Sequence, residues 1–176
     1  MEKKTLSNTN AGLILFMVMA VYTLILNLSN LQSNSALSWL SYLIVIGGIS
    51  IFVIRYAKDR EGNVTFGNLF GYGFKICAIL TVFYIVFMVL FYLIFPEYKE
   101  QLLEVATQKA IERAKGDDTE NVLKGMEMFK RFFWVGLIAG IMFSFALLGA
   151  IGSLIGAALS KKNPNTFQRD INQIGS

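Results

Sequence analysis

The chain has 176 residues, of which 55% are hydrophobic, 14% aromatic and only 16% charged, and its mean hydropathy is +0.53. A soluble domain usually has about 45–50% apolar and about 25% charged residues, so the composition predicts a membrane protein. The net charge of +4 does not indicate a nucleic-acid partner, because the basic residues lie beside the ends of apolar runs and form no basic stripe. With one cysteine and no histidine, the chain cannot form an intramolecular disulfide and lacks the common zinc and iron ligand sets. We interpret the cysteine, Cys77, as a packing residue rather than a reactive thiol.

Four apolar runs are long enough to cross a hydrocarbon core of about 30 Å, which needs about 20 residues of helix. They cover residues 11–28, 37–54, 76–95 and 133–159. The sequence therefore predicts an all-α, four-span transmembrane helical bundle at residues 1–160, a single domain, and a cytoplasmic tail at 161–176. The first run has an alternative interpretation as a signal peptide. No small-x-small cleavage site follows it, which favours an uncleaved helix.

The distribution of Lys and Arg predicts the orientation, since short loops rich in these residues favour the cytoplasm. The first connector, "SNLQSNSA", is uncharged, whereas basic residues lie at the amino terminus, in the second connector and at the start of the tail: Lys3, Lys4, Arg55, Lys58, Arg60, Lys161 and Lys162. We therefore expect both termini in the cytoplasm. The connector at 96–132 has seven basic and eight acidic residues, and long segments obey the rule weakly. Within it, Lys130 and Arg131 argue against this orientation.

The stretch "TFGNLFGYGFK" at 65–75 precedes the third run. Its large apolar residues recur at helical spacing, at Phe66, Leu69, Phe70 and Phe74, which predicts a short interfacial helix at the membrane surface. A nucleotide-binding loop at its three glycines is disfavoured, because no strand precedes them and no Walker lysine–serine pair follows.

The third connector predicts two helices. In "EYKEQLLEVATQKAIERAK" apolar residues recur at steps of three and four, with Glu and Lys on the other face. "GDDTE" then provides a turn and an N-cap at Asp118 or Thr119. A second helix is expected to continue without a break into the fourth run. Together they predict an extracytoplasmic helical hairpin at about 97–131.

The fourth run contains a ladder of small residues at Gly136, Gly140, Ser144, Gly149, Gly152, Ser153 and Gly156. Small residues at this spacing let two helix backbones approach closely, so we predict that they are helix-packing residues. The partner is a helix of the same chain or of a second copy, and the three other helices favour the same chain.

Several motifs, taken in order, resemble one family. They are "SWLSYLIVIGG", "YAKD" with Gly62, "TFGNLFGYGFK", "FPEY", "GMEMFKRF", and a glycine-rich last span that ends in Lys161, Lys162 and Pro164. Over nearly the whole chain they resemble the bacterial domain-of-unknown-function 4199 family of small four-helix membrane proteins. The resemblance implies the four-span topology in a bacterial inner (plasma) membrane, and it implies no activity or site.

No span has an Asp, Glu, Lys or Arg in its centre, where such residues usually mark a transport pathway. We therefore expect a non-enzymatic, multi-pass membrane interaction or accessory component. Its expected partners are the lipid bilayer and other membrane proteins or a second copy, with no catalytic residue, cofactor, metal or nucleic acid.

Two alternative functions would each require a structural feature that the accessory role does not. Small-solute transport or permeation, by an oligomer in particular, would be favoured by a water-filled cavity lined by Tyr22, Asn27, Thr81 and Tyr84, whereas a dry centre would favour the accessory role. A membrane-embedded enzyme would need clustered acids, and we interpret Glu97, Glu100 and Glu104 as solvated helix surface.

Overall fold

The structure, a computed structural model, describes residues 6–29, 31, 34–113 and 119–161. These residues form helices and no strand: α1 (Asn8–Leu28), α2 (Ser35–Asp59), α3 (Phe66–Ile94), α4 (Pro96–Arg113), α5 (Thr119–Arg131) and α6 (Phe133–Leu159). Four of them, α1, α2, α3 and α6, are long and apolar enough to cross a membrane. The predicted all-α class and the four spans are therefore confirmed.

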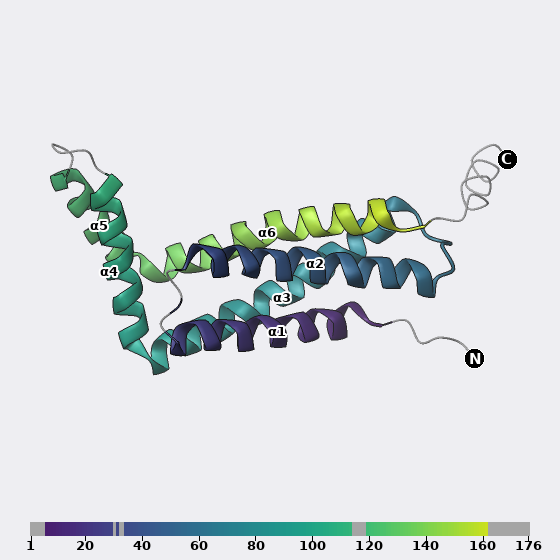
Figure 1. Ribbon diagram of the computed structural model, residues 1–176, viewed down its shortest axis with the longest axis horizontal. Helices are drawn as coiled ribbons and strands as arrows, with labels where there is room; N and C mark the ends of the chain where they lie inside the picture. Colours follow the sequence, from purple (N-terminus) through teal and green to yellow (C-terminus); the bar gives the residue numbers. More distant parts are fainter. Residues whose placement is uncertain (1–5, 30, 32–33, 114–118, 162–176) are drawn as a thin grey trace.

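The four long helices lie side by side, and α4 and α5 run across them at one end (Figure 1). At the opposite end, the connection from α2 to α3 lies near the beginning of α1 and the end of α6 (Figure 1). The largest interfaces join α3 to α6, α2 to α6 and α1 to α3. Although α1 and α2 are consecutive, they contact each other little. The bundle is therefore held together mainly through α3 and α6.

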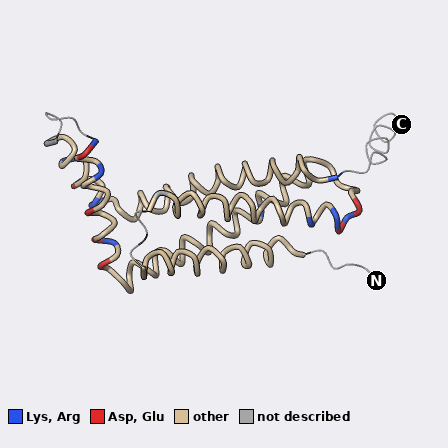
Figure 2. The backbone as a smooth tube through the Cα atoms, in the orientation of Figure 1, with Lys and Arg blue, Asp and Glu red and all other residues tan. Residues whose placement is uncertain are grey.

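The apolar core runs through the half of the bundle near the α2–α3 connection. On α2, Val45, Ile49 and Val53 are each 0% exposed, and every fourth residue of a helix lies on the same face. On α3, Ile76 and Leu80 are also 0% exposed. The core contains no charged side chain among the described residues. Charged residues instead lie toward the two ends of the molecule (Figure 2).

Local signals explain where three of the spans begin. Ser7, Asn34 and Thr65 precede α1, α2 and α3, and each side-chain oxygen accepts a hydrogen bond from a backbone N–H of the first turn. After α2, Glu61 and Gly62 adopt φ angles of 53° and 76°, so the chain reverses toward α3. A left-handed backbone conformation is energetically unfavourable for most residues but not for glycine, which explains the glycine at this turn.

The first two helices extend beyond their predicted spans because hydropathy marks a span and not the end of a helix. α1 begins three residues before the predicted 11–28, at the Ser7 cap. α2 extends past Ile54 through the charged residues to Asp59. These additional residues retain helical hydrogen bonding outside the apolar run.

A separate interfacial helix is not present. Residues 66–75 are the first turns of α3, which is continuous over 29 residues. The reason is packing: Leu69 is 0% exposed and Tyr72 is 6% exposed, and both belong to the core. Tyr72 also stacks on Tyr56, with ring centroids 4.1 Å apart, and donates a hydrogen bond to the Leu6 carbonyl oxygen. At about 1.5 Å per residue, α3 is longer than a hydrocarbon core of about 30 Å.

The helices α4 and α5 contact each other at the end of the bundle. α4 is fixed by an aromatic cluster in which Phe91, Tyr92, Tyr98 and Phe133 join α3, α4 and α6. The predicted continuity from the second connector helix into the fourth span is wrong, because Phe132 breaks it with φ −102° and ψ 21°. The N-cap candidate Asp118 and the tail from residue 162 onward lie outside the described residues.

Candidate functional site

The C-terminal half of the small-residue ladder on α6 lies directly against α2. A Cβ atom added to Gly156 would lie 2.7 Å from the Cβ of Val53 and 3.0 Å from the Cα of Ser50. A Cβ on Gly152 would lie 3.0 Å from the carbonyl oxygen of Ile46. The Ser50 hydroxyl donates across this contact to the Gly152 carbonyl oxygen at 2.9 Å and is also 2.8 Å from the Ile46 carbonyl oxygen. Close approach and an interhelical hydrogen bond therefore occur together.

The same half of α6 also contacts α3 through small residues. A Cβ on Gly149 would collide with Cys77, whose thiol donates a hydrogen bond to the Phe145 carbonyl oxygen at 3.0 Å. Ser153 is 0% exposed and lies against Gly73, where an added Cβ would be 2.5 Å from the Ser153 Oγ. That Oγ has no hydrogen-bond partner among the described residues. Small size, rather than polarity, is what this position requires.

The N-terminal half of the ladder has different surroundings. A Cβ on Gly140 would meet no atom within 4 Å, and Ser144 is exposed. Gly136 is half-buried, and a Cβ there would lie 3.2 Å from the ring of Phe129 on α5. Of the seven ladder residues, four contact α2 or α3, one contacts α5 and two point away from the bundle.

Three further glycines make close contacts that the spacing rule did not select. A Cβ on Gly12 would lie 2.7 Å from the Cγ2 of Ile79, and one on Gly48 would lie 2.5 Å from the Cδ1 of Leu15. Gly73 is the third. Each contact uses a single glycine, so no repeat at four residues marks it. The signal in the sequence was only the presence of glycine within a long apolar helix.

The four polar side chains predicted to line a transport pathway do not line one common cavity in the part of the chain that the structure describes. Tyr22, Asn27 and Thr81 each donate to a backbone carbonyl oxygen, those of Leu37, Thr23 and Cys77 respectively. Only Tyr84 bonds to a side chain of another helix, the hydroxyl of Thr23 at 2.9 Å. These four residues therefore do not form the water-filled cavity that would indicate a transport pathway.

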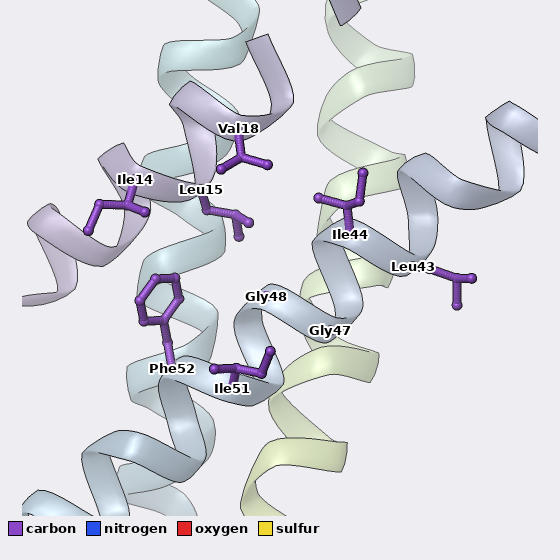
Figure 3. A pocket seen from close by; sticks show the side chains of 9 residues that line it. All are labelled: Ile14, Leu15, Val18, Leu43, Ile44, Gly47, Gly48, Ile51 and Phe52. Atoms are coloured by element: carbon purple, nitrogen blue, oxygen red, sulfur yellow. The ribbon is translucent and has the colours of Figure 1, made fainter. Parts of the chain in front are cut away.

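A lateral groove of about 370 Å³ separates α1 from α2 (Figure 3). Its walls are apolar: Ile14 and Val18 belong to α1, and Leu43, Ile51 and Phe52 belong to α2. The α2 surface also includes Gly47 and Gly48 (Figure 3). The groove follows from the weak contact between the two helices. It offers apolar contact and no hydrogen-bonding side chain.

The acidic residues considered for catalysis lie at the surface. Glu97, Glu100 and Glu104 are exposed on α4. In the described ranges, no three residues of the types His, Cys, Asp and Glu lie close enough together to hold a metal ion. The close interhelical contacts that the described residues make are helix-packing contacts.

Four long apolar helices in one bundle fit a multi-pass membrane protein. The chain belongs to the family described as "Protein of unknown function (DUF4199)", whose family model matches residues 10–162. The resemblance predicted from the order of motifs is therefore confirmed. No curated protein and no solved structure matches the chain.

Proposed function

We propose that the chain is a non-enzymatic interaction or accessory component of a membrane. The observation that supports this role best is the closed core near the α2–α3 connection. Ile49, Val53, Ile76 and Leu80 are each 0% exposed, and they belong to one apolar core cluster to which all four spans contribute. A dry, charge-free layer opposes the movement of polar solutes.

We also propose how the chain is oriented in the membrane. The end of the bundle with the α2–α3 connection has Arg55, Lys58, Arg60 and Lys161 against Asp59 and Glu61 among its described residues. This excess of positive charge favours the cytoplasmic side of a bacterial inner membrane, with both termini there. The pair α4 and α5 then forms an extracytoplasmic helical hairpin, and the first turns of α3 lie at the cytoplasmic surface.

The hairpin provides the exposed surface that a partner needs. Met128 on α5 is 65% exposed and Leu123 is 45% exposed, although both side chains are apolar. Exposed apolar side chains on a helix that lies across the ends of the spans favour contact with another protein or with lipid.

The proposal is tested by photo-crosslinking in intact membranes. A benzophenone side chain is introduced at Met128 or at Phe143, which faces outward on α6, and at buried Phe145 as the matched control. We expect one partner of constant mass, either another protein or a second copy, from at least one exposed position and none from Phe145.

The transport alternative is measured in parallel on purified protein in liposomes. We expect no solute flux above that of empty liposomes. Flux together with the lack of a consistent crosslinked partner would overturn the accessory role and favour transport.

A further inference from the structure

A cavity of about 220 Å³ lies between the four spans. Each span contributes to its wall: Met19 from α1, Ser38 and Ser41 from α2, Tyr84 from α3, and Phe145 from α6. The cavity is distinct from the groove between α1 and α2, which shares none of these residues. It lies where α1 and α2 leave space, because α1 packs mainly on α3 and α2 mainly on α6.

The cavity extends from one end of α2 toward the middle of the bundle. Ser38 lies in the first turn of α2 and Val45 is its last lining residue on that helix. Seven residues of helix correspond to about 10 Å. One turn further along, Ile49 is 0% exposed. Ile49 does not line the cavity, so the cavity does not extend along the whole length of the bundle.

The hydroxyl groups of the wall have free capacity for hydrogen bonds. Ser38 and Ser41 donate to the carbonyl oxygens of Asn34 and Leu37, at 3.2 and 3.3 Å. Their oxygens consequently remain acceptors.

The Tyr84 hydroxyl has a different capacity. It shares one hydrogen bond with Thr23, in which either oxygen can be the donor. The phenol of Tyr84 can therefore accept a hydrogen bond from a ligand, or donate one when Thr23 acts as the donor. This pattern suits a ligand hydroxyl, which both donates and accepts.

Size and charge restrict the ligand further. An apolar cavity of about 150 Å³ holds a benzene molecule, whereas drug-sized ligands occupy about 300–1,000 Å³. A cavity between these sizes fits one ring or a short alkyl chain. The described residues of its wall include no Asp, Glu, Lys or Arg, and a charged ligand within the bundle would be strongly disfavoured.

From these observations we propose that the cavity binds a small neutral amphiphile, a molecule with one hydroxyl group on a single ring or short chain. The hydroxyl bonds to Tyr84 and the serines, and the apolar part contacts Met19 and Phe145. This proposal does not depend on the proposed function. If the chain binds such a molecule but has no membrane partner, the accessory role is refuted and the proposal of a binding cavity stands.

The test uses 4-fluorophenol as the probe, with ¹⁹F NMR on the full-length protein in nanodiscs. We expect saturable binding that unlabelled phenol displaces. Ser41→Leu fills the cavity and should abolish the saturable signal, whereas Ser144→Leu, the same change at an exposed position of α6, should retain it.

Tyr84→Phe keeps the ring in place and removes only the hydroxyl. Loss of one hydrogen bond should weaken 4-fluorophenol binding about fivefold. The matched probe 4-fluorotoluene lacks the hydroxyl and therefore its bonds to both Tyr84 and the serines. It should bind the wild-type chain at least about fivefold more weakly than 4-fluorophenol, and it should respond little to Tyr84→Phe.

Three results would overturn the proposal. They are the lack of saturable 4-fluorophenol binding, undiminished binding by a folded Ser41→Leu variant, and equal binding of the two probes. Because Tyr84→Phe is nearly isosteric, it tests hydroxyl recognition even where Ser41→Leu fails to fold.

Discussion

Gly156→Ala should destabilise the bundle, although it adds only one methyl group. The new Cβ would lie 2.7 Å from the Cβ of Val53 and 3.0 Å from the Cα of Ser50. Carbon atoms pack best at about 3.5–4.0 Å, so α2 and α6 would have to separate by roughly 1 Å. The Ser50 contact is with backbone, which no rotamer change relieves. Such overpacking typically costs about 1–3 kcal/mol.

The assay is thermal unfolding of the purified protein in detergent. For a chain of this length each kcal/mol corresponds to about 2–4 °C, so the melting temperature should fall by about 2–12 °C. Gly140→Ala is the matched control: the same substitution on the same helix, at a position where the added Cβ meets nothing within 4 Å. It should change the melting temperature by no more than about 2 °C.

Equal melting temperatures for the two variants would refute the argument that close approach at Gly156 is a stabilising contact. A large loss for Gly140→Ala alone would instead show that the outward half of the ladder is an interface between copies. A crosslinked dimer that disappears in Gly140→Ala would identify that interface directly.

The remaining predictions concern hydrogen bonds, thiol reactivity and orientation. Ser50→Ala removes the interhelical bond to the Gly152 carbonyl and should cost about 0.6 kcal/mol. Ser153→Ala removes a buried hydroxyl that has no hydrogen-bond partner among the described residues, so it should be neutral or stabilising. A lower melting temperature for Ser153→Ala would contradict this reasoning. Cys77 is 2% exposed and should react with maleimide only after denaturation in SDS, so mass-spectrometric detection of rapid labelling of the folded chain would disprove its packing role. Leu31→Cys should react with a membrane-impermeant thiol reagent from the extracytoplasmic side and Lys58→Cys should not, and labelling of Lys58→Cys alone would invert the proposed orientation.

Hydropathy predicted the spans well because the length of an apolar run is a direct requirement of the bilayer. The last span matches its predicted residues 133–159 at both ends, since polar or charged residues flank it closely. The start of α3 was harder to predict. Glycines and aromatic residues at 66–74 favour a surface helix by composition, and only the partners of Leu69 and Gly73 show that this segment is part of the bundle.

The small-residue ladder shows the limit of spacing arguments. Gly140 and Gly156 both belong to repeats at four residues, yet one points outward and the other touches α2. Each step of four residues advances about 40° around a helix, so the two glycines lie about 160° apart and face nearly opposite sides of α6. The cavity at Tyr84 could likewise not be predicted from the sequence, because its wall comes from four separate helices.

The weak contact between α1 and α2 has a consequence for biogenesis. The two helices leave the ribosome first and one after the other, yet the main partner of α1 is α3 and the main partner of α2 is α6, the last span to be synthesised. α2 therefore lacks its main partner until almost the whole chain has been translated. During that time its face with Val45, Ile49 and Val53 is exposed to lipid. Nascent chains that end before α6 should be the substrates of membrane quality control, and chains that include Gly156 should escape it.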